Sequence, residues 1–158
     1  MEILRELLPA PQHIGGIIDP TVPPTVGWEA AQRGALQLGL NLHAIEVRTP
    51  DQIEKAFADL RAVHADAVVV FVSSMLFEIR DRIAQLGVNN QLPVMFLYRE
   101  GVDVGGLLSY GPHLPDLWRR SATYVDKILR GARAAELPIE QPTKFELVIN
   151  LRPPRRSA

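Results

Sequence analysis

The stretch ADAVVVFVSS (65–74) decides the fold of this chain. Within it, Ala67 to Val72 is an unbroken apolar run, rich in β-branched residues, that is too short to cross a membrane and too uniform for a half-exposed strand. Strands buried on both faces have this composition, and they lie in the middle of parallel sheets. The run ends at Ser73 and Ser74, and in open α/β sheets ligands bind outside the carboxyl ends of the strands. This segment therefore predicts both a fold and the place of a binding site.

Strand and helix patterns alternate on both sides of this stretch, with short connections. We expect strands at 13–18, 41–47, 67–72 and 92–97. We expect helices at 2–8, from Pro24 or Thr25 to Leu38, from a cap at 49–51 to Val63, and at 75–86, the last ended by Gly87. Such alternation predicts an α/β fold with three layers, in which residues 14–18, 42–47, 67–72 and 93–97 form a parallel sheet in the flavodoxin-like order 2-1-3-4.

The last third of the chain has a different pattern. A short extended piece at 105–111 is framed by glycines, an amphipathic helix is predicted at 114–129, and an extended connector at 138–142 leads to a final strand at 144–151. We therefore divide the chain into an α/β lobe (1–98), a crossover segment with a helix and a returning strand (99–151), and a disordered tail (152–158).

Composition and charge exclude several classes of protein. The 158 residues suffice for one domain or one lobe, and 17 basic residues against 18 acidic ones argue against nucleic-acid binding. The chain has no cysteine, which excludes disulfides, thiolate catalysis and cysteine metal sites. The N-terminus lacks the layout of a signal peptide, so the chain as written is expected to stay in the cytoplasm.

The motifs of common enzymes are missing. No glycine-rich phosphate loop follows the first predicted strand, and no G-x-S-x-G motif surrounds Ser73. The four histidines, at 13, 43, 64 and 113, do not have metal-ligand spacing and are best interpreted as surface or loop residues. Ser73 also stands where a phospho-receiver has a carboxylate. We therefore expect no catalysis, no metal and no cofactor.

Polar side chains gather at the predicted strand ends. They are Asp19, Ser73, Ser74, Tyr98, Arg99, Glu100, Ser109 and Tyr110. Hydroxyls, an aromatic ring, a guanidinium and carboxylates suit a small zwitterion such as an amino acid. Simpler roles remain open: loop capping for Asp19 and Ser74, ring packing for Tyr98, and a surface ion pair between Arg99 and Glu100. We expect the first four of these residues to cluster at one edge of the sheet, with the hydroxyls on a ligand carboxylate and Tyr98 on its ring.

Four segments carry a family resemblance: GGLLSYGP (105–112), DLWRR (116–120), YVDKILRG (124–131) and LPIEQPTKFELVIN (137–150). They resemble the substrate-binding proteins of ABC importers, in the subgroup similar to tryptophan/tyrosine-binding lipoproteins. The resemblance extends back through 98–100 and 19–20 and so covers about residues 1–151. It implies a periplasmic solute-binding protein that delivers an aromatic or branched amino acid to an ABC permease.

Members of that family have the type I periplasmic binding fold, in which two α/β lobes are joined by crossing segments and close over a ligand. The resemblance implies that this chain corresponds to the carboxyl-side half, with 99–112 as a crossing segment and the helix at 113–130 packed on the other lobe. Two departures are visible: Ser74-Met75 stands where the family usually has a proline, and RPPRR (152–156) stands where the family continues into a helix.

A second reading is an interaction module, a single lobe that assembles through the surface meant for its partner lobe. The predicted helix 114–129 presents an apolar stripe that includes Leu117, Trp118, Val125 and Ile128. We therefore expect a two-fold homodimer, with residues 105–151 exchanged between subunits. A flavodoxin-like enzyme is a third reading, disfavoured by the missing phosphate loop.

Overall fold

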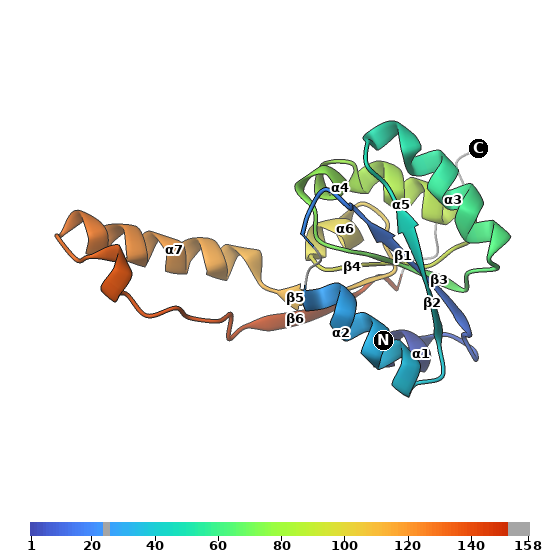
Figure 1. Ribbon diagram of the computed structural model, residues 1–158, viewed down its shortest axis with the longest axis horizontal. Helices are drawn as coiled ribbons and strands as arrows, with labels where there is room; N and C mark the ends of the chain where they lie inside the picture. The colour runs from blue at the N-terminus through green and yellow to red at the C-terminus, as the bar shows by residue number, and fades with distance from the viewer. Residues whose placement is uncertain (24–25, 152–158) are drawn as a thin grey trace.

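The computed structural model describes residues 1–23 and 26–151 of the chain (Figure 1). The helices are α1 (Glu2–Leu7), α2 (Val26–Gln37), α3 (Ile53–Ala62), α4 (Ser74–Glu78), α5 (Arg80–Asn89), α6 (Arg99–Asp103) and α7 (Leu114–Leu129), with 3-10 turns at Pro50–Gln52 and Ala134–Glu136. The strands are β1 (His13–Ile18), β2 (Asn41–Glu46), β3 (Ala67–Val70), β4 (Val94–Phe96), β5 (Leu108–Pro112) and β6 (Phe145–Ile149). The predicted helix start at Pro24 or Thr25 and the predicted tail at 152–158 lie outside the described residues.

The six strands form one sheet in the order β2-β1-β3-β4-β5-β6. The first five strands of that order run parallel, and β6 is antiparallel to β5. The predicted order 2-1-3-4 of a parallel sheet is therefore confirmed, and the sheet continues beyond it by two strands. β1 and β3 lie in its middle and are buried, as their apolar composition indicates.

Helices cover both faces of this sheet and make a three-layer body (Figure 1). On one face, α3 and α5 bury side chains such as Phe57, Leu60 and Ile83 against β1, β3 and β4. On the other face, α1 and α2 contribute Leu4 and Ala35 to a second apolar cluster. The body is stabilised mainly by this burial, because each large apolar side chain removed from water contributes about 1.5–3 kcal/mol.

The region after the central strand differs from prediction. β3 ends at Val70, so that Phe71 and Val72 continue the apolar run beyond the sheet. The single helix expected at 75–86 is two helices, α4 and α5, which meet at Ile79. Gly87 does not end α5 but lies buried within it. A Cβ atom at this position would lie only 2.4 Å from a methyl group of Val94, so a larger residue would not fit there. The glycine therefore allows close packing of helix on strand instead of stopping the helix.

The segment 99–112, expected to be a crossing segment, contains regular structure. α6 occupies its first residues, and β5 then joins the sheet in parallel with β4. The boundary that we placed between residues 98 and 99 stays a prediction.

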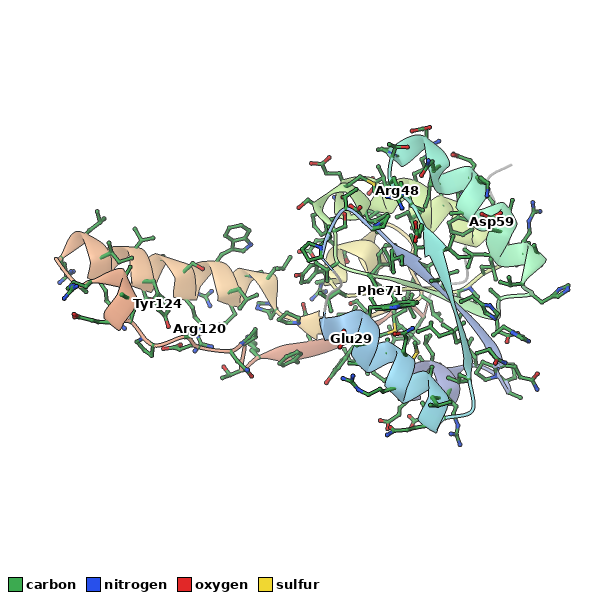
Figure 2. The ribbon with its side chains drawn as sticks, viewed as in Figure 1. Glu29, Arg48, Asp59, Phe71, Arg120 and Tyr124 are labelled. Carbon is green, nitrogen blue, oxygen red and sulfur yellow. The ribbon has the colours of Figure 1, made fainter. Side chains whose placement is uncertain are left out.

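The helix α7 projects away from the body, together with the chain that returns to β6 (Figure 1). No residue of α7 is buried. Tyr124 donates a hydrogen bond of 2.7 Å to the carbonyl of Pro138, and Arg120 pairs with Glu140, so that both side chains face the returning chain (Figure 2). We call α7 and residues 130–144 the arm. Within the arm, polar contacts join α7 to the returning chain, whereas the body has an apolar core.

Candidate functional site

The ends of β1, β3 and β4 meet at one edge of the sheet, which we call the carboxyl edge. Asp19 follows β1 and Ser73 follows β3, and the Ser73 hydroxyl donates a hydrogen bond of 2.6 Å to Oδ2 of Asp19. The other carboxylate oxygen, Oδ1, accepts from the backbone N–H and the hydroxyl of Thr21, at 2.9 and 2.6 Å. These bonds tie the two loops together and leave acceptor capacity on the carboxylate, since each oxygen can accept two hydrogen bonds.

The Asp19 carboxyl is held in its ionised form. Partial burial by itself raises its pKa, but the hydrogen bonds from Ser73 and Thr21 and the nearby Arg48 outweigh burial, so the pKa lies below its usual range. The carboxyl edge therefore presents a negative charge at neutral pH.

The two serines have different roles. Ser73 is buried and is the N-cap of α4, where its Oγ accepts from the backbone N–H of Leu76 at 3.4 Å. Ser74, for which we considered the capping role, is instead the exposed first residue of α4. Since the single hydroxyl proton of Ser73 is donated to Asp19, Ser73 has no second donor to offer a ligand.

Tyr98 follows β4 at the same edge and precedes α6. Its ring meets that of Phe77 edge to face, with 6.0 Å between centroids. Burial, and then the charge of Glu100, raise the pKa of the Tyr98 phenol, so it stays protonated at neutral pH.

Arg99 and Glu100 do not pair with each other, in contrast to the surface pair that we considered. Arg99 lies 3.9 Å from Asp103 and 3.6 Å from Glu146 of β6. One carboxylate oxygen of Glu100, Oε2, is buried without a hydrogen-bond partner among the residues that the structure describes.

Ser109 and Tyr110 lie within β5 and not after its end. Ser109 is fully buried between β4 and β6, where it pairs in register with Phe96 and Val148, and its Oγ has no hydrogen-bond partner among the described residues. Tyr110 is exposed, and its ring lies 6.1 Å from that of Phe145. The extended conformation of the piece at 105–111 was predicted, but its position inside the sheet could not be predicted from its own residues.

Within the described residues, Phe71 and Val72 line two hollows that open at the carboxyl edge. The larger has a volume of about 270 Å³ and is lined by Ile18, Asp19, Pro20, Val22, Pro23, Trp28, Phe71 and Val72. The Trp28 and Phe71 rings meet edge to face there, at 5.0 Å between centroids, with Phe71 shown beside α2 in Figure 2. An aromatic wall beside a carboxylate suits a small ligand with an apolar part and an ammonium group.

The smaller hollow, of about 30 Å³, lies between the ends of β3 and β4, with Ser73, Phe77, Arg80 and Tyr98 in its lining. The Arg80 guanidinium lies over the Phe77 ring, at 4.7 Å from its centroid, and its Nη1 donates to the Phe77 carbonyl at 2.9 Å. Sequence analysis missed Arg80 because it falls inside a predicted helix. It missed Trp28 and Phe71 because apolar residues in regular elements resemble core.

Two other hollows lie away from this edge. One, of about 390 Å³, separates α7 from the returning chain, and one of about 240 Å³ lies beside the N-terminal end of β4. Neither contains residues that we predicted for the site.

His64 and His113 lie outside the helices and strands, as expected. His13 and His43 are instead partly buried in β1 and β2, and Nδ1 of His13 lies 3.0 Å from Nε2 of His43. Within residues 1–23 and 26–151, no group of three or more histidine, aspartate or glutamate side chains could hold a metal ion.

A family model described as ABC transporter substrate binding protein matches residues 1–155 of this chain. The chain belongs to this family. The predicted family is therefore confirmed. No curated protein matches the chain.

Three solved structures are similar to this chain. A conserved domain protein from Vibrio cholerae has a TM-score of 0.87 at 20% identity, over 95% of this chain and 51% of that one. The ABC domain from Streptococcus pneumoniae in complex with L-Trp has a TM-score of 0.86 at 21% identity, over 94% and 52%. A ligand-free, open substrate-binding protein with adhesive properties from Clostridium difficile has a TM-score of 0.69 at 18% identity, over 95% and 51%.

The chain thus spans about half the length of these structures, and the likeness establishes the fold of one lobe of a periplasmic binding protein. Among its described helices, none has both the length and the apolar character required to cross a membrane.

Proposed function

We propose that this substrate-binding protein binds an amino acid with an aromatic or branched side chain at its carboxyl edge, outside the cytoplasm, and delivers it to an ABC permease. The larger hollow supplies the ligand's surroundings: Asp19 for the ammonium group, and the rings of Trp28 and Phe71 for the side chain. The S. pneumoniae structure, described as a complex with L-Trp, supports this ligand class.

The observation that carries the proposal is the charge and setting of Asp19. A carboxylate whose pKa is lowered, beside aromatic rings and at the end of a central parallel strand, is a typical counter-ion for a ligand cation. The hollow is near the lower limit of ligand pockets, about 300 Å³.

The remaining predicted residues have secondary roles in this proposal. Tyr98, which precedes α6 and lines the smaller hollow, and Ser74, the first residue of α4, border the ligand in this proposal. Arg99 and Glu100 follow Tyr98 along the chain, while Ser109 and Tyr110 support the adjoining strand.

Calorimetric titration of the chain with L-tryptophan, L-phenylalanine and L-leucine tests the proposal. We expect saturable binding of at least one of them, and a loss of affinity on the order of tenfold in Asp19→Asn, because a hydrogen-bonded charge pair is removed.

Asp66→Asn is the matched control. Asp66 accepts hydrogen bonds from the backbone N–H groups of Gln12 and His13, at 2.7 and 2.9 Å, and its pKa is also lowered, but it lies at the opposite ends of the strands. Its replacement should leave the affinity within about twofold of wild type. Equal losses in the two variants, or none in Asp19→Asn, contradict the role of Asp19.

A second candidate function, assembly through the arm, is favoured by one observation. The side chains of Trp118 and Leu129 on α7 are 72% and 81% exposed, and Val125 between them is 55% exposed. Large apolar side chains that recur along one helix face mark an interaction surface. A homodimer that exchanges residues 105–151 covers this face, and light scattering at micromolar concentration should then give twice the chain mass. A monomer contradicts the dimer.

A further inference from the structure

The donors available to a ligand carboxylate at the carboxyl edge are few. Ser73 has given its only proton to Asp19, and it accepts from the backbone of Leu76. An amino acid bound beside Asp19 therefore needs another partner for its own carboxylate, since a buried anion without hydrogen bonds is strongly unfavourable.

Arg80 is the candidate for that partner. It is the first residue of α5, and the short helix α4 turns the chain back so that Arg80 lines the same hollow as Ser73 and Tyr98. This hollow adjoins the one that contains Asp19, because Phe71 and Val72 line both.

The guanidinium of Arg80 is held in position, but not all of its N–H groups have hydrogen-bond partners. Phe77 holds it by its carbonyl and by its ring, and the side chain is 29% exposed. Its Nε–H is buried and, across the described part of the chain, has no hydrogen-bond partner. The carboxylate of Asp81 stands 3.8 Å away from Nε and is 71% exposed, which makes it a weak, solvated counter-ion.

An unpaired N–H in a guanidinium that cannot lose its charge is unfavourable, and a carboxylate matches its planar donors. We infer that Arg80 binds the α-carboxylate of the ligand while Asp19 binds its α-ammonium group, so that the site requires a free amino acid. This inference rests on the proposed function and adds the residue that sets its ligand specificity. Asp19 accepts a hydrogen bond from Ser73, and Arg80 lines a hollow together with Ser73, so a charge of each sign is available to one ligand near this serine.

The role of Arg80 predicts discrimination between an amino acid and its carboxamide. Calorimetric titration of the chain with L-tryptophan and with L-tryptophanamide, which keeps the ring and the ammonium group, measures this ratio. Wild type should bind the amino acid on the order of 10- to 100-fold more tightly, as expected for loss of a charge-assisted hydrogen-bonded pair. In the ¹⁵N spectrum, the Nε–H resonance of Arg80 should move with L-tryptophan and not with the amide.

Arg80→Gln should bring the affinity for L-tryptophan down to that for the amide and change the amide affinity by less than about twofold. Arg80→Lys should recover part of the discrimination, because it keeps the charge without the planar fork. Arg82→Gln is the matched control, since Arg82 lies on the same helix but bonds to Glu54 of α3 at 2.6 Å; it should discriminate as wild type does.

The outcomes separate the two proposals. If wild type binds L-tryptophan and Arg80→Gln binds it equally well, Arg80 has no role and the proposed function stands. If Arg80→Gln weakens both compounds alike, Arg80 does not recognise the carboxylate and the inference is overturned. If wild type binds neither L-tryptophan nor the other amino acids tested, the proposed function fails, and the role of Arg80 with it.

Discussion

The body and the arm of this chain differ in how much apolar surface they bury. In the body, α3 buries Ile53, Ala56, Phe57 and Leu60 against the sheet. In the arm, α7 is the longest helix described and has an apolar stripe at the same spacing, yet it buries none of its residues. An amphipathic pattern thus predicts a helix with a face to cover, but it does not tell what covers that face.

The largest contrast is expected from truncation of one aromatic side chain in each region. Phe57→Ala should lower the free energy of unfolding by about 3–5 kcal/mol, since Phe57 is 2% exposed and leaves a cavity. Trp118→Ala in α7 should change it by no more than about 0.5 kcal/mol in the monomer. Urea unfolding followed by circular dichroism measures both, and a loss above 2 kcal/mol in Trp118→Ala shows that the arm is packed in solution.

Two glycines, one in the body and one in the arm, test the same difference in packing. At Gly111 in β5, a Cβ atom would lie 2.2 Å from the backbone oxygen of Leu97, so Gly111→Ala should cost about 1–3 kcal/mol. Gly131 follows α7 with a φ of +99° and open space around it, so Gly131→Ala should strain only the end of the arm. Thermal unfolding should show a lower Tm for the first variant alone. An equal drop in both contradicts the open setting of the arm.

Stability of the body should fall in acid through Asp19 and Asp66. Both carboxyls have a pKa lowered in the folded protein, so each stabilises the fold above its unfolded pKa of about 4, and this contribution is lost as the pH falls through the folded pKa. The free energy of unfolding, measured by urea titration between about pH 5 and 2, should decline less steeply in Asp66→Asn than in wild type. An unchanged slope shows that the hydrogen bonds from Gln12 and His13 do not favour the ionised form.

The smallest effect on stability is expected from the hydrogen bond that joins α7 to the returning chain. Tyr124→Phe removes the bond to the Pro138 carbonyl, which is worth about 1 kcal/mol. Amide hydrogen exchange should speed up in residues 134–142 while Tm stays unchanged. Exchange that quickens throughout the sheet shows instead that arm and body unfold together.

The sequence predicted the strands of the body well because each is a compact apolar or alternating run between turn signals. The order 2-1-3-4 followed from the strand–helix alternation alone. The end of α5 was not predicted, because it depends on packing. Gly87 has the sequence pattern of a helix end, and its role in close packing follows only from its contact with Val94.

The candidate site was predictable in part. Asp19, Ser73 and Tyr98 were identified because residues that follow parallel strands meet at one edge, and a hydrogen bond does join the first two. Arg80, Trp28 and Phe71 were missed because each falls within a predicted helix or strand. The burial of Ser109 was also missed, since it follows from strands on both sides that are distant in sequence.

The central claim is that the body, and not the arm, carries the ligand site. A ¹⁵N–¹H titration of the chain with L-tryptophan tests it most directly. We predict that the resonances of Asp19, Ser73, Arg80 and Tyr98 shift in a saturable way, while those of residues 117–129 stay in place. Saturable shifts confined to α7 and the returning chain contradict the account.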